Sequence, residues 1–461
     1  MIKAILTNGE LTETEITDLI NSHDTTGYVE NEHYFKGNNP TILATNDKDD
    51  NEITPNNKIP VPYGRKIALT TKNYLFSRPV NYSSNDKDYM EQVLDVFYIN
   101  KNMQKTADIG LDLIVHGVAF KLFYTDVVAG ALTPLYAVIY QNEMITVYDY
   151  SVEPQLIAAI RYYDQTDAAD VTTTKVEVYY SDKIVKYDMS GSALSSRKEI
   201  KHDFGRVPVI EYGDDYQIGV FDSVKKIIDA LDVVVSTDVN EVQRFEMLYM
   251  ILIGDKLPSN PDKVKAMVQR RIFELSPGAQ MSYLEKHIDA DFNMQLWDRL
   301  EKLIHTMSGV PDFDSKDFAA ESGVALLYKL LGFENIASQY ESQFIQGEYE
   351  SIDCINAILF RQKNVFDKFK FWKANKAKQV EITLQRNLPE DVAQRLTEAK
   401  QMKDLGVSDE TVFDYIPTVK DVKEELKRSE EQSQRNFDRF QANMTAKTEE
   451  ETEEVEGEDV A

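Results

Sequence analysis

The hydrophobic period of the chain changes from strand-like to helical near Asp215, and this change limits the folds that the sequence can adopt. From about 115 to 210, apolar and aromatic residues form short runs broken by acidic residues, Gly, Pro or Ser, which is typical of β-strands. After Asp215 the apolar residues recur at steps of three and four, which is typical of helices. The sequence therefore predicts an α+β protein in which an antiparallel β-rich module precedes a series of helices.

The first helix predicted after this change covers about 218–253, and its apolar stripe begins with Val220, Val224, Ile227 and Leu231. At 1.5 Å per residue it would be about 50 Å long, several times the length of an average helix. We expect a helix of this length to span or line something.

The same patterns predict the remaining elements. Residues 175–180 alternate between two faces, as in a strand with one face exposed. Thr12 and Glu15 form a capping-box pattern. Further predicted elements are a helix at 12–22, a helix at 291–307 that Gly309 and Pro311 end, a long helix from about 323 that Gly332 and Gly347 bend, a strand at 379–385 and two or three helices within 389–440.

The chain is strongly acidic, with 51 Lys and Arg residues against 78 Asp and Glu residues and a net charge of −27. This charge disfavours a broad basic surface that coats nucleic acid, and it disfavours docking on an anionic membrane. No apolar run approaches the roughly 18 residues of a membrane span, and we recognise no secretory signal. The single cysteine, Cys354, cannot form an intramolecular disulfide, which fits assembly in a reducing cytosol. The acidic segment 447–461 has no apolar stripe and is expected to be disordered.

The sequence lacks the patterns of the common catalytic and cofactor sites. It contains neither G-x-x-x-x-G-K-[ST] nor G-x-G-x-x-G, the loops that hold nucleotide phosphates. Its six histidines never pair at metal-ligand spacing. Cys354 has no histidine nearby in the sequence, so we expect it to be a core or interface residue. We therefore expect no catalytic residue, no metal and no cofactor.

A basic and aromatic segment at 361–378 stands out, with seven Lys or Arg residues against one Asp and hence a local charge of +6. One interpretation is contact with a nucleic-acid backbone. The alternatives are an amphipathic helix end whose lysines complement the helix dipole, or a face that pairs with an acidic neighbouring subunit. The candidate DNA contacts are Lys363, Lys368, Lys370, Lys373, Lys376 and Lys378.

Four segments, in order along the chain, resemble the portal proteins of tailed bacteriophages, of the type common in siphoviruses of Gram-positive hosts. They read PNNKIPVPYGRKIALTTKNYLFSRPVNY at 55–82, HGVAFKLFYTD at 116–126, HDFGRVPVIEYGDD at 202–215 and SGVPDFDSKDFAAESGVALLYKLLG at 308–332. The resemblance extends over residues 30 to 440.

The resemblance implies a portal fold, in a ring of twelve subunits around a central channel at one capsid vertex. In this family a β-rich wing, two long stem helices, a clip, a tunnel loop with a long bent helix and a helical crown follow one another. In this sequence the regions are the N-terminal arm and wing at 1–217, stem helices at 218–253 and 289–309, the clip at 254–288, the tunnel loop at 310–322, the bent helix and a returning wing strand at 323–388, the crown at 389–440 and a disordered acidic tail at 441–461.

The resemblance gives roles to two charged regions. The predicted tunnel loop carries a net charge of −3, and we expect its channel-facing residues to let DNA slide, because each basic contact with a phosphate adds affinity. These residues are Asp312, Asp314, Lys316, Asp317 and Glu321. The predicted clip carries +3 over 255–271, and its basic residues either dock terminase or an adaptor or form a solvated helix face. They are Lys256, Lys263, Lys265, Arg270 and Arg271.

Because the chain has no nucleotide site, the resemblance implies that the packaging motor is a partner, the terminase large subunit. The expected function is a conduit for double-stranded DNA during genome packaging and ejection. The other expected partners are scaffolding and major capsid proteins and a head-completion adaptor. The expected location is the virion, after assembly in the host cytoplasm. Two rival interpretations are an acid-rich, metal-dependent nuclease or other hydrolase, and a different ring-shaped head–tail connector, which is typically far shorter.

Overall fold

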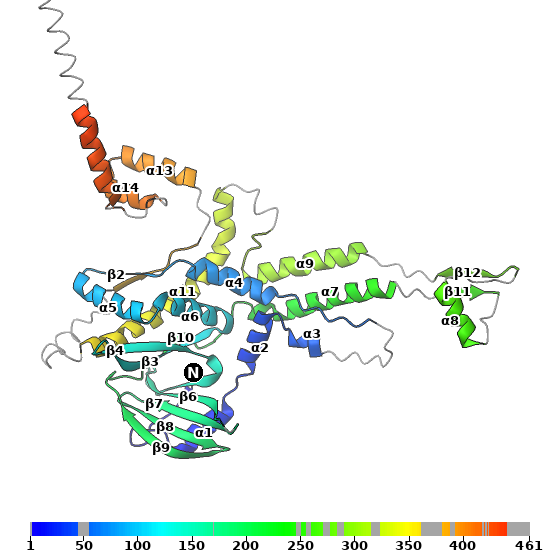
Figure 1. The fold of residues 1–461 in the computed structure, drawn as a ribbon, viewed down its shortest axis with the longest axis horizontal. Coiled ribbons are helices and arrows are strands. Elements are labelled where there is room, and N and C mark those ends of the chain that lie inside the picture. The colour runs from blue at the N-terminus through cyan, green and yellow to red at the C-terminus, as the bar shows by residue number, and fades with distance from the viewer. Residues whose placement is uncertain are drawn as a thin grey trace, which may run out of the picture. The chain divides into compact units, whose positions relative to one another are not determined.

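The chain folds into two compact units, Met1–Asn387 and Leu388–Ala461. The computed structural model describes residues 2–44, 55–168, 170–245, 250–254, 260–270, 277–283, 290–314, 323–360, 380–387, 392–416, 419, 422 and 424–439. The first unit mixes helices with four separate sheets, and the described part of the second is helical, so the protein is of the α+β class (Figure 1).

The helices of the first unit are α1 (Glu13–Ser22), α2 (Thr26–Lys36), α3 (Pro40–Ala44), α4 (Tyr63–Phe76), α5 (Lys87–Ile99), α6 (Asn102–His116), α7 (Lys225–Phe245), α8 (Pro261–Arg270), α9 (Ala290–Ser308) and α11 (Gly323–Leu359), with 3-10 turns at η1 (Gln141–Glu143) and η2 (Asp222–Val224). The predicted capping box begins α1, where the Thr12 hydroxyl accepts from the Glu15 amide and the Glu15 carboxylate accepts from the Thr12 amide. The helix predicted at 12–22 is therefore confirmed.

The larger sheet has six strands in the order β1-β5-β6-β7-β8-β9, antiparallel except where β1 joins β5. A second sheet has the order β10-β3-β4. The strands of these two sheets are β1 (Ile2–Lys3), β3 (Val118–Val128), β4 (Ala131–Ile139), β5 (Met144–Tyr148), β6 (Leu156–Thr166), β7 (Thr172–Tyr179), β8 (Lys183–Ser190), β9 (Ala193–Lys201) and β10 (Val209–Gly213). The antiparallel β-rich module predicted from about 115 to 210 is confirmed.

Both faces of the six-stranded sheet are covered near its centre. One face packs against α1 through a cluster that contains Ile16, Val176 and Val178. The other face packs against the three-stranded sheet through a cluster that contains Val118 and Tyr179. The half-exposed strand predicted at 175–180 is therefore wrong, because the smaller sheet buries the face that was expected to meet solvent.

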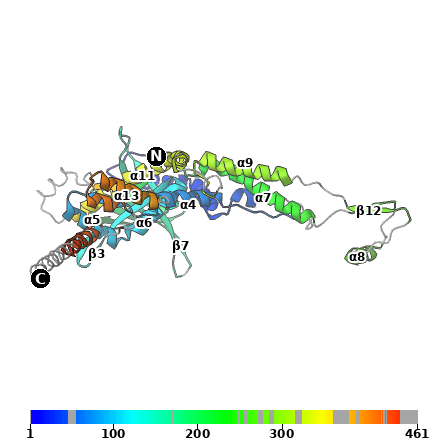
Figure 2. The ribbon, with the colours of Figure 1, turned by 90° about the horizontal axis from the view of Figure 1, so that it is seen from above.

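The long helix predicted over 218–253 is also wrong at both ends. Its first turn is the 3-10 turn η2, and α7 spans Lys225–Phe245. Met250–Ile253 forms strand β11, which pairs with β12 (Gln280–Tyr283) in a two-stranded antiparallel sheet. Four consecutive apolar residues followed by Gly254 at φ +83° suit a strand that ends in a turn, and cross-strand pairing overrides the helical spacing. In the sequence this small sheet and α8 lie between α7 and α9, which run side by side (Figures 1 and 2).

Helix α11 provides much of the core of the first unit. Phe333, Ala337, Phe344 and Ile355 of this helix are fully buried, and so is Cys354. Burial raises the pKa of the Cys354 thiol to about 12, so the reactive thiolate is disfavoured and the prediction of a core cysteine is confirmed. The bends predicted at Gly332 and Gly347 stay predictions.

The strand predicted at 379–385 is confirmed as β13 (Val380–Thr383), which pairs with β2 (Asn81–Ser84). The guanidinium of Arg386, just after β13, contacts the carboxylates of Glu334 and Glu341 on α11 at 2.5 and 2.6 Å. The segment that contains β13 and Arg386 is therefore attached both to strand β2, which is distant in the sequence, and to the preceding helix α11.

An extended arm at 57–61 lies along α7 and is attached to it by a regular set of hydrogen bonds. Its alternate amides at Asn57, Ile59 and Val61 donate to side chains four residues apart on the helix. The acceptors are Asn240 at 2.6 Å, Ser236 at 2.9 Å and Asp232 at 2.8 Å. The polar face of α7 thus satisfies backbone amides that have no strand partner.

The described part of the second unit contains α13 (Val392–Asp404), α14 (Asp409–Tyr415) and a helical stretch at 424–439. This agrees with the two or three helices predicted for 389–440. The predicted acidic tail, 441–461, lies outside the described residues. Among the helices that the structure describes, none is both long and apolar enough to cross a membrane.

Candidate functional site

The C-terminal end of α9 leads directly into the predicted tunnel loop. Gly309 ends the helix at φ +67°, a backbone conformation that favours glycine, and a Cβ at this position would lie 2.3 Å from Cδ1 of Ile336. Val310 is buried. The turn is therefore packed closely against α11, which fixes where the loop begins.

Lys66 of α4 attaches the first acidic residues of the loop to the body of the subunit. Its ammonium lies 3.3 Å from Oδ1 of Asp312 and 3.0 Å from Oδ2 of Asp314. Partial burial would lower the pKa of Lys66, but hydrogen bonds to Asp314 and Asp312 raise it above its usual value. Lys66 is thus held in its charged form, and it offsets part of the negative charge of the loop.

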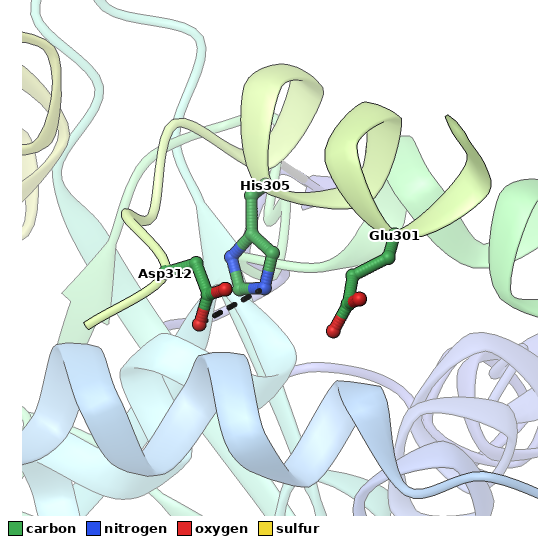
Figure 3. A group of neighbouring side chains, drawn as sticks. All are labelled: Glu301, His305 and Asp312. Carbon is green, nitrogen blue, oxygen red and sulfur yellow. Dashed lines mark ion pairs between the residues drawn. The ribbon is translucent and has the colours of Figure 1, made fainter. Parts of the chain in front are cut away.

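A second contact between α4 and α9 lies beside this ion pair. The Tyr63 hydroxyl donates to Oε1 of Glu301 at 2.5 Å, and burial together with this bond raises the pKa of Tyr63. Glu301 also faces His305, one helical turn later, and His305 faces Asp312 (Figure 3). Glu301, His305 and Asp312 form the group, among the described residues, whose donor atoms are close enough to hold a metal ion.

The structure describes two of the five predicted loop residues. Asp312 keeps 26% of its side-chain exposure and Asp314 keeps 81%, so Asp314 is the more accessible acid. Lys316, Asp317 and Glu321 lie outside the described residues.

Of the predicted clip residues, Lys263 and Lys265 are exposed on α8. Lys256 and Arg271 lie outside the described residues, as does the side chain of Arg270. The six candidate DNA contacts, Lys363, Lys368, Lys370, Lys373, Lys376 and Lys378, also lie outside them. Their roles stay predictions.

Sequence reasoning missed the contribution of Lys66, Tyr63, Glu301 and His305. The four-residue step between Glu301 and His305 was readable, because it places both on one face of the helix predicted at 291–307. A search for paired histidines could not find a group with one imidazole and two carboxylates. Lys66 lies 246 positions before Asp312, and no local pattern connects them.

Residues 18–437 match the family described as "Phage portal protein, SPP1 Gp6-like". The chain belongs to this family of phage portal proteins, as its resemblance to portal sequences predicted. A protein named "Portal protein" from Clostridium phage phiCD119 is 23% identical to it over 324 residues, which cover 66% of this chain and 72% of that relative.

Membership of this family has three general consequences. Portal proteins are a structural, non-enzymatic class, they form homo-oligomeric rings, and they reside in the phage capsid.

Proposed function

We propose that this chain forms a ring-shaped conduit through which double-stranded DNA enters the procapsid during packaging and leaves the virion during ejection. In this proposal it is not an enzyme, and the terminase large subunit supplies the motor. The observation that carries the proposal is the order of elements within the matched region. Helices α7 and α9 pair side by side, and the two-stranded β11–β12 sheet with α8 separates them in the sequence.

In this arrangement α7 and α9 form the stem, and 250–283 forms the clip. Residues 310–322 form the tunnel loop, the two larger sheets form the wing, and the helices of the second unit form the crown. The clip begins at β11, a few residues earlier than the sequence had indicated.

The ring is supported by apolar side chains that the isolated subunit leaves exposed on the paired helices. They include Val233 and Val242 on α7 and Met294 and Met307 on α9, each more than half exposed. Subunit contacts would remove this apolar surface from water. Negative-stain electron microscopy of the purified protein tests the proposal: we expect rings with a central hole, and small globular particles would contradict it. The ring is expected to contain twelve subunits, which symmetry-resolved images would count.

The loop is proposed to act as a low-friction constriction. Because Lys66 pairs with both Asp312 and Asp314, the negative charge of the loop depends more on the acids that follow, Asp317 and Glu321. The double change D317K/E321K should slow or stall DNA in an in vitro packaging assay, since added lysines bind phosphates. The matched control is E153K/D182K, the same double charge change at exposed residues of the wing. Packaging by D317K/E321K at the rate of the control would rule out this role.

The clip is proposed to dock terminase and later a head-completion adaptor. Reversing the two exposed lysines of α8, K263E/K265E, should weaken terminase binding measured with purified proteins, mainly through a slower association rate. The control K198E/K201E makes the same charge change on exposed lysines of β9. If K263E/K265E and K198E/K201E bound terminase equally well, the lysines of α8 would form a solvated helix face without a role in docking. Assembly with scaffolding and major capsid proteins in the host cytoplasm completes the proposal.

A further inference from the structure

Glu301, His305 and Asp312 form a cluster that the conduit function does not use. Glu301 and His305 project from successive turns of α9, and Asp312 approaches from the segment that follows the helix (Figure 3). The ligand atoms of the three side chains all lie within 4.8 Å of one another. This brings together an imidazole nitrogen and two carboxylates from opposite sides of the Gly309 turn.

The hydrogen bonding of His305 leaves one ring nitrogen available. Nδ1 lies 2.9 Å from the carbonyl oxygen of Val310, and because a carbonyl can only accept, Nδ1 carries the proton. In the neutral imidazole, Nε2 therefore carries a lone pair. The His305 side chain is only 10% exposed, and Nε2 is buried without a hydrogen-bond partner among the described residues.

The surroundings of Nε2 explain why this lone pair is unusual. Nε2 lies 4.0 Å from Oδ1 of Asp312, too far for a hydrogen bond. In the neutral form of His305, a buried nitrogen lone pair faces two carboxylates, and these three groups offer electron pairs without a proton among them. A cation placed between them would satisfy all three groups.

The charge of the cluster points in the same direction. Three negative charges come from Glu301, Asp312 and Asp314, and one positive charge comes from Lys66. With neutral His305, these four charged side chains leave a net charge of −2, which one divalent cation would cancel. Tyr63 orients Glu301 through Oε1, and a carboxylate retains lone pairs for a second partner.

We propose that Glu301, His305 and Asp312 bind one divalent transition-metal ion per subunit. Mixed nitrogen and oxygen donors suit Zn²⁺ or Mn²⁺, whereas Mg²⁺ and Ca²⁺ prefer oxygen ligands alone. The bond from Nδ1 of His305 to the Val310 carbonyl is the outer contact that commonly fixes a metal-binding imidazole. The ion would connect the end of α9 to the start of the tunnel loop and hold the loop in place. This site does not depend on the proposed function.

The test measures metal binding by the full-length chain, purified without a histidine tag. The protein is dialysed against Zn²⁺ and then against metal-free buffer, and retained zinc is counted by mass spectrometry. We expect about one ion per chain in the wild type, and at least about tenfold weaker binding in H305Q and in E301Q. The matched control is H33Q, which removes an exposed imidazole from α2 and should bind as the wild type does.

A second measurement uses the wild-type chain and does not depend on how the variants fold. Pulsed electron paramagnetic resonance of Mn²⁺ bound at one equivalent should show coupling to an imidazole nitrogen, which a site made only of carboxylates lacks. This separates the cluster from loose binding by the many other acidic residues. Zinc retention by H305Q equal to that of the wild type, or a Mn²⁺ signal without nitrogen coupling, would overturn the proposal.

Discussion

The ammonium of Lys121 on β3 and the carboxylate of Glu348 on α11 form an ion pair 2.5 Å apart, in which both side chains are fully buried. Glu348 also accepts hydrogen bonds from Tyr212 at 2.6 Å and Tyr82 at 2.9 Å, and Lys121 donates to Ser351. The pair thus connects strands β2, β3 and β10 to the long helix. Its two charges are tolerated in the core because each has its partner and further hydrogen bonds.

Removing one charge of this pair should be costly. In K121M the carboxylate of Glu348 stays buried without its cation, and we expect the free energy of unfolding to fall by about 3–5 kcal/mol. The control K175M breaks the pair of Lys175 with Asp188, whose side chains are 31% and 36% exposed, and should cost about 1 kcal/mol or less. Thermal unfolding followed by circular dichroism compares the two variants. Similar losses in both would show that Lys121 and Glu348 contribute no more than a surface pair.

Two glycines of α11 should respond oppositely to the same substitution. A Cβ at Gly347 would lie 2.4 Å from the ring of buried Tyr212, so G347A should force the ring or the helix to move and destabilise the protein by about 1–3 kcal/mol. A Cβ at Gly332 would meet no atom within 4 Å, and G332A should stabilise the helix by up to about 1 kcal/mol. Thermal midpoints of the two variants provide the comparison. A gain in stability for G347A would mean that α11 does not pack on Tyr212 in this way.

Asp112 on α6 should make stability depend on pH near neutrality. Burial raises the pKa of its carboxyl from 3.8 to about 7. The folded protein therefore holds this proton where the unfolded chain has released it, so stability falls as pH rises from about 4 to about 7 and then levels off. D112N cannot ionise, and its thermal midpoint should rise relative to the wild type between pH 5 and pH 8.

Subtracting the stability of the wild type from that of D112N at each pH removes the contribution of the other titrating groups, which both proteins share. A tenfold change in proton affinity is worth about 1.4 kcal/mol, so we expect D112N to gain about 1–3 kcal/mol by pH 8. D95N, at an exposed aspartate of α5, is the control and should follow the wild type. A constant difference between D112N and the wild type across this range would mean that Asp112 titrates as an ordinary carboxyl.

The exposed apolar face of α7 should matter for ring assembly rather than for folding. Val242 is 65% exposed, and V242D should reduce the fraction of rings in size-exclusion chromatography while leaving the subunit folded. V152D makes the same change at a fully exposed valine before β6, where we expect rings to form normally. If V242D formed rings at the wild-type level, Val242 would not lie in the contact between subunits.

Local patterns predicted the local structure well. The capping box of Thr12 and Glu15 and the short β-branched runs depend on neighbours in the sequence, and both are confirmed. The predicted helix was wrongly extended over 250–253 because four consecutive apolar residues fit both the helical and the strand period. Pairing with the strand at 280–283 decides between the two structures. Burial of Tyr179 was unreadable for the same reason, since the sheet that packs against it is formed by separate segments of the sequence.

The candidate site was only partly predictable. The resemblance located the loop, and charge counting identified its acids, but neither could supply Lys66, which lies on α4 and reaches Asp312 only through the tertiary fold. The orientation of the His305 ring depends on a carbonyl five residues later that becomes available because the helix ends at Gly309. Such contacts follow from three-dimensional packing and leave no signature in composition or spacing.

The series of hydrogen bonds between the arm at 57–61 and α7 can extend over only a few residues. Four residues of helix advance about 6.0 Å, whereas two residues of extended chain advance about 6.6 Å. The spacing of the arm's alternate amides therefore exceeds the spacing of their acceptors on α7 by about 0.6 Å at every step. The three bonds to Asp232, Ser236 and Asn240 already span two steps. A fourth in the same series would be displaced by about 1.8 Å, more than a hydrogen bond tolerates. The geometry of the two backbones thus fixes how far the arm can follow the helix before it must leave it.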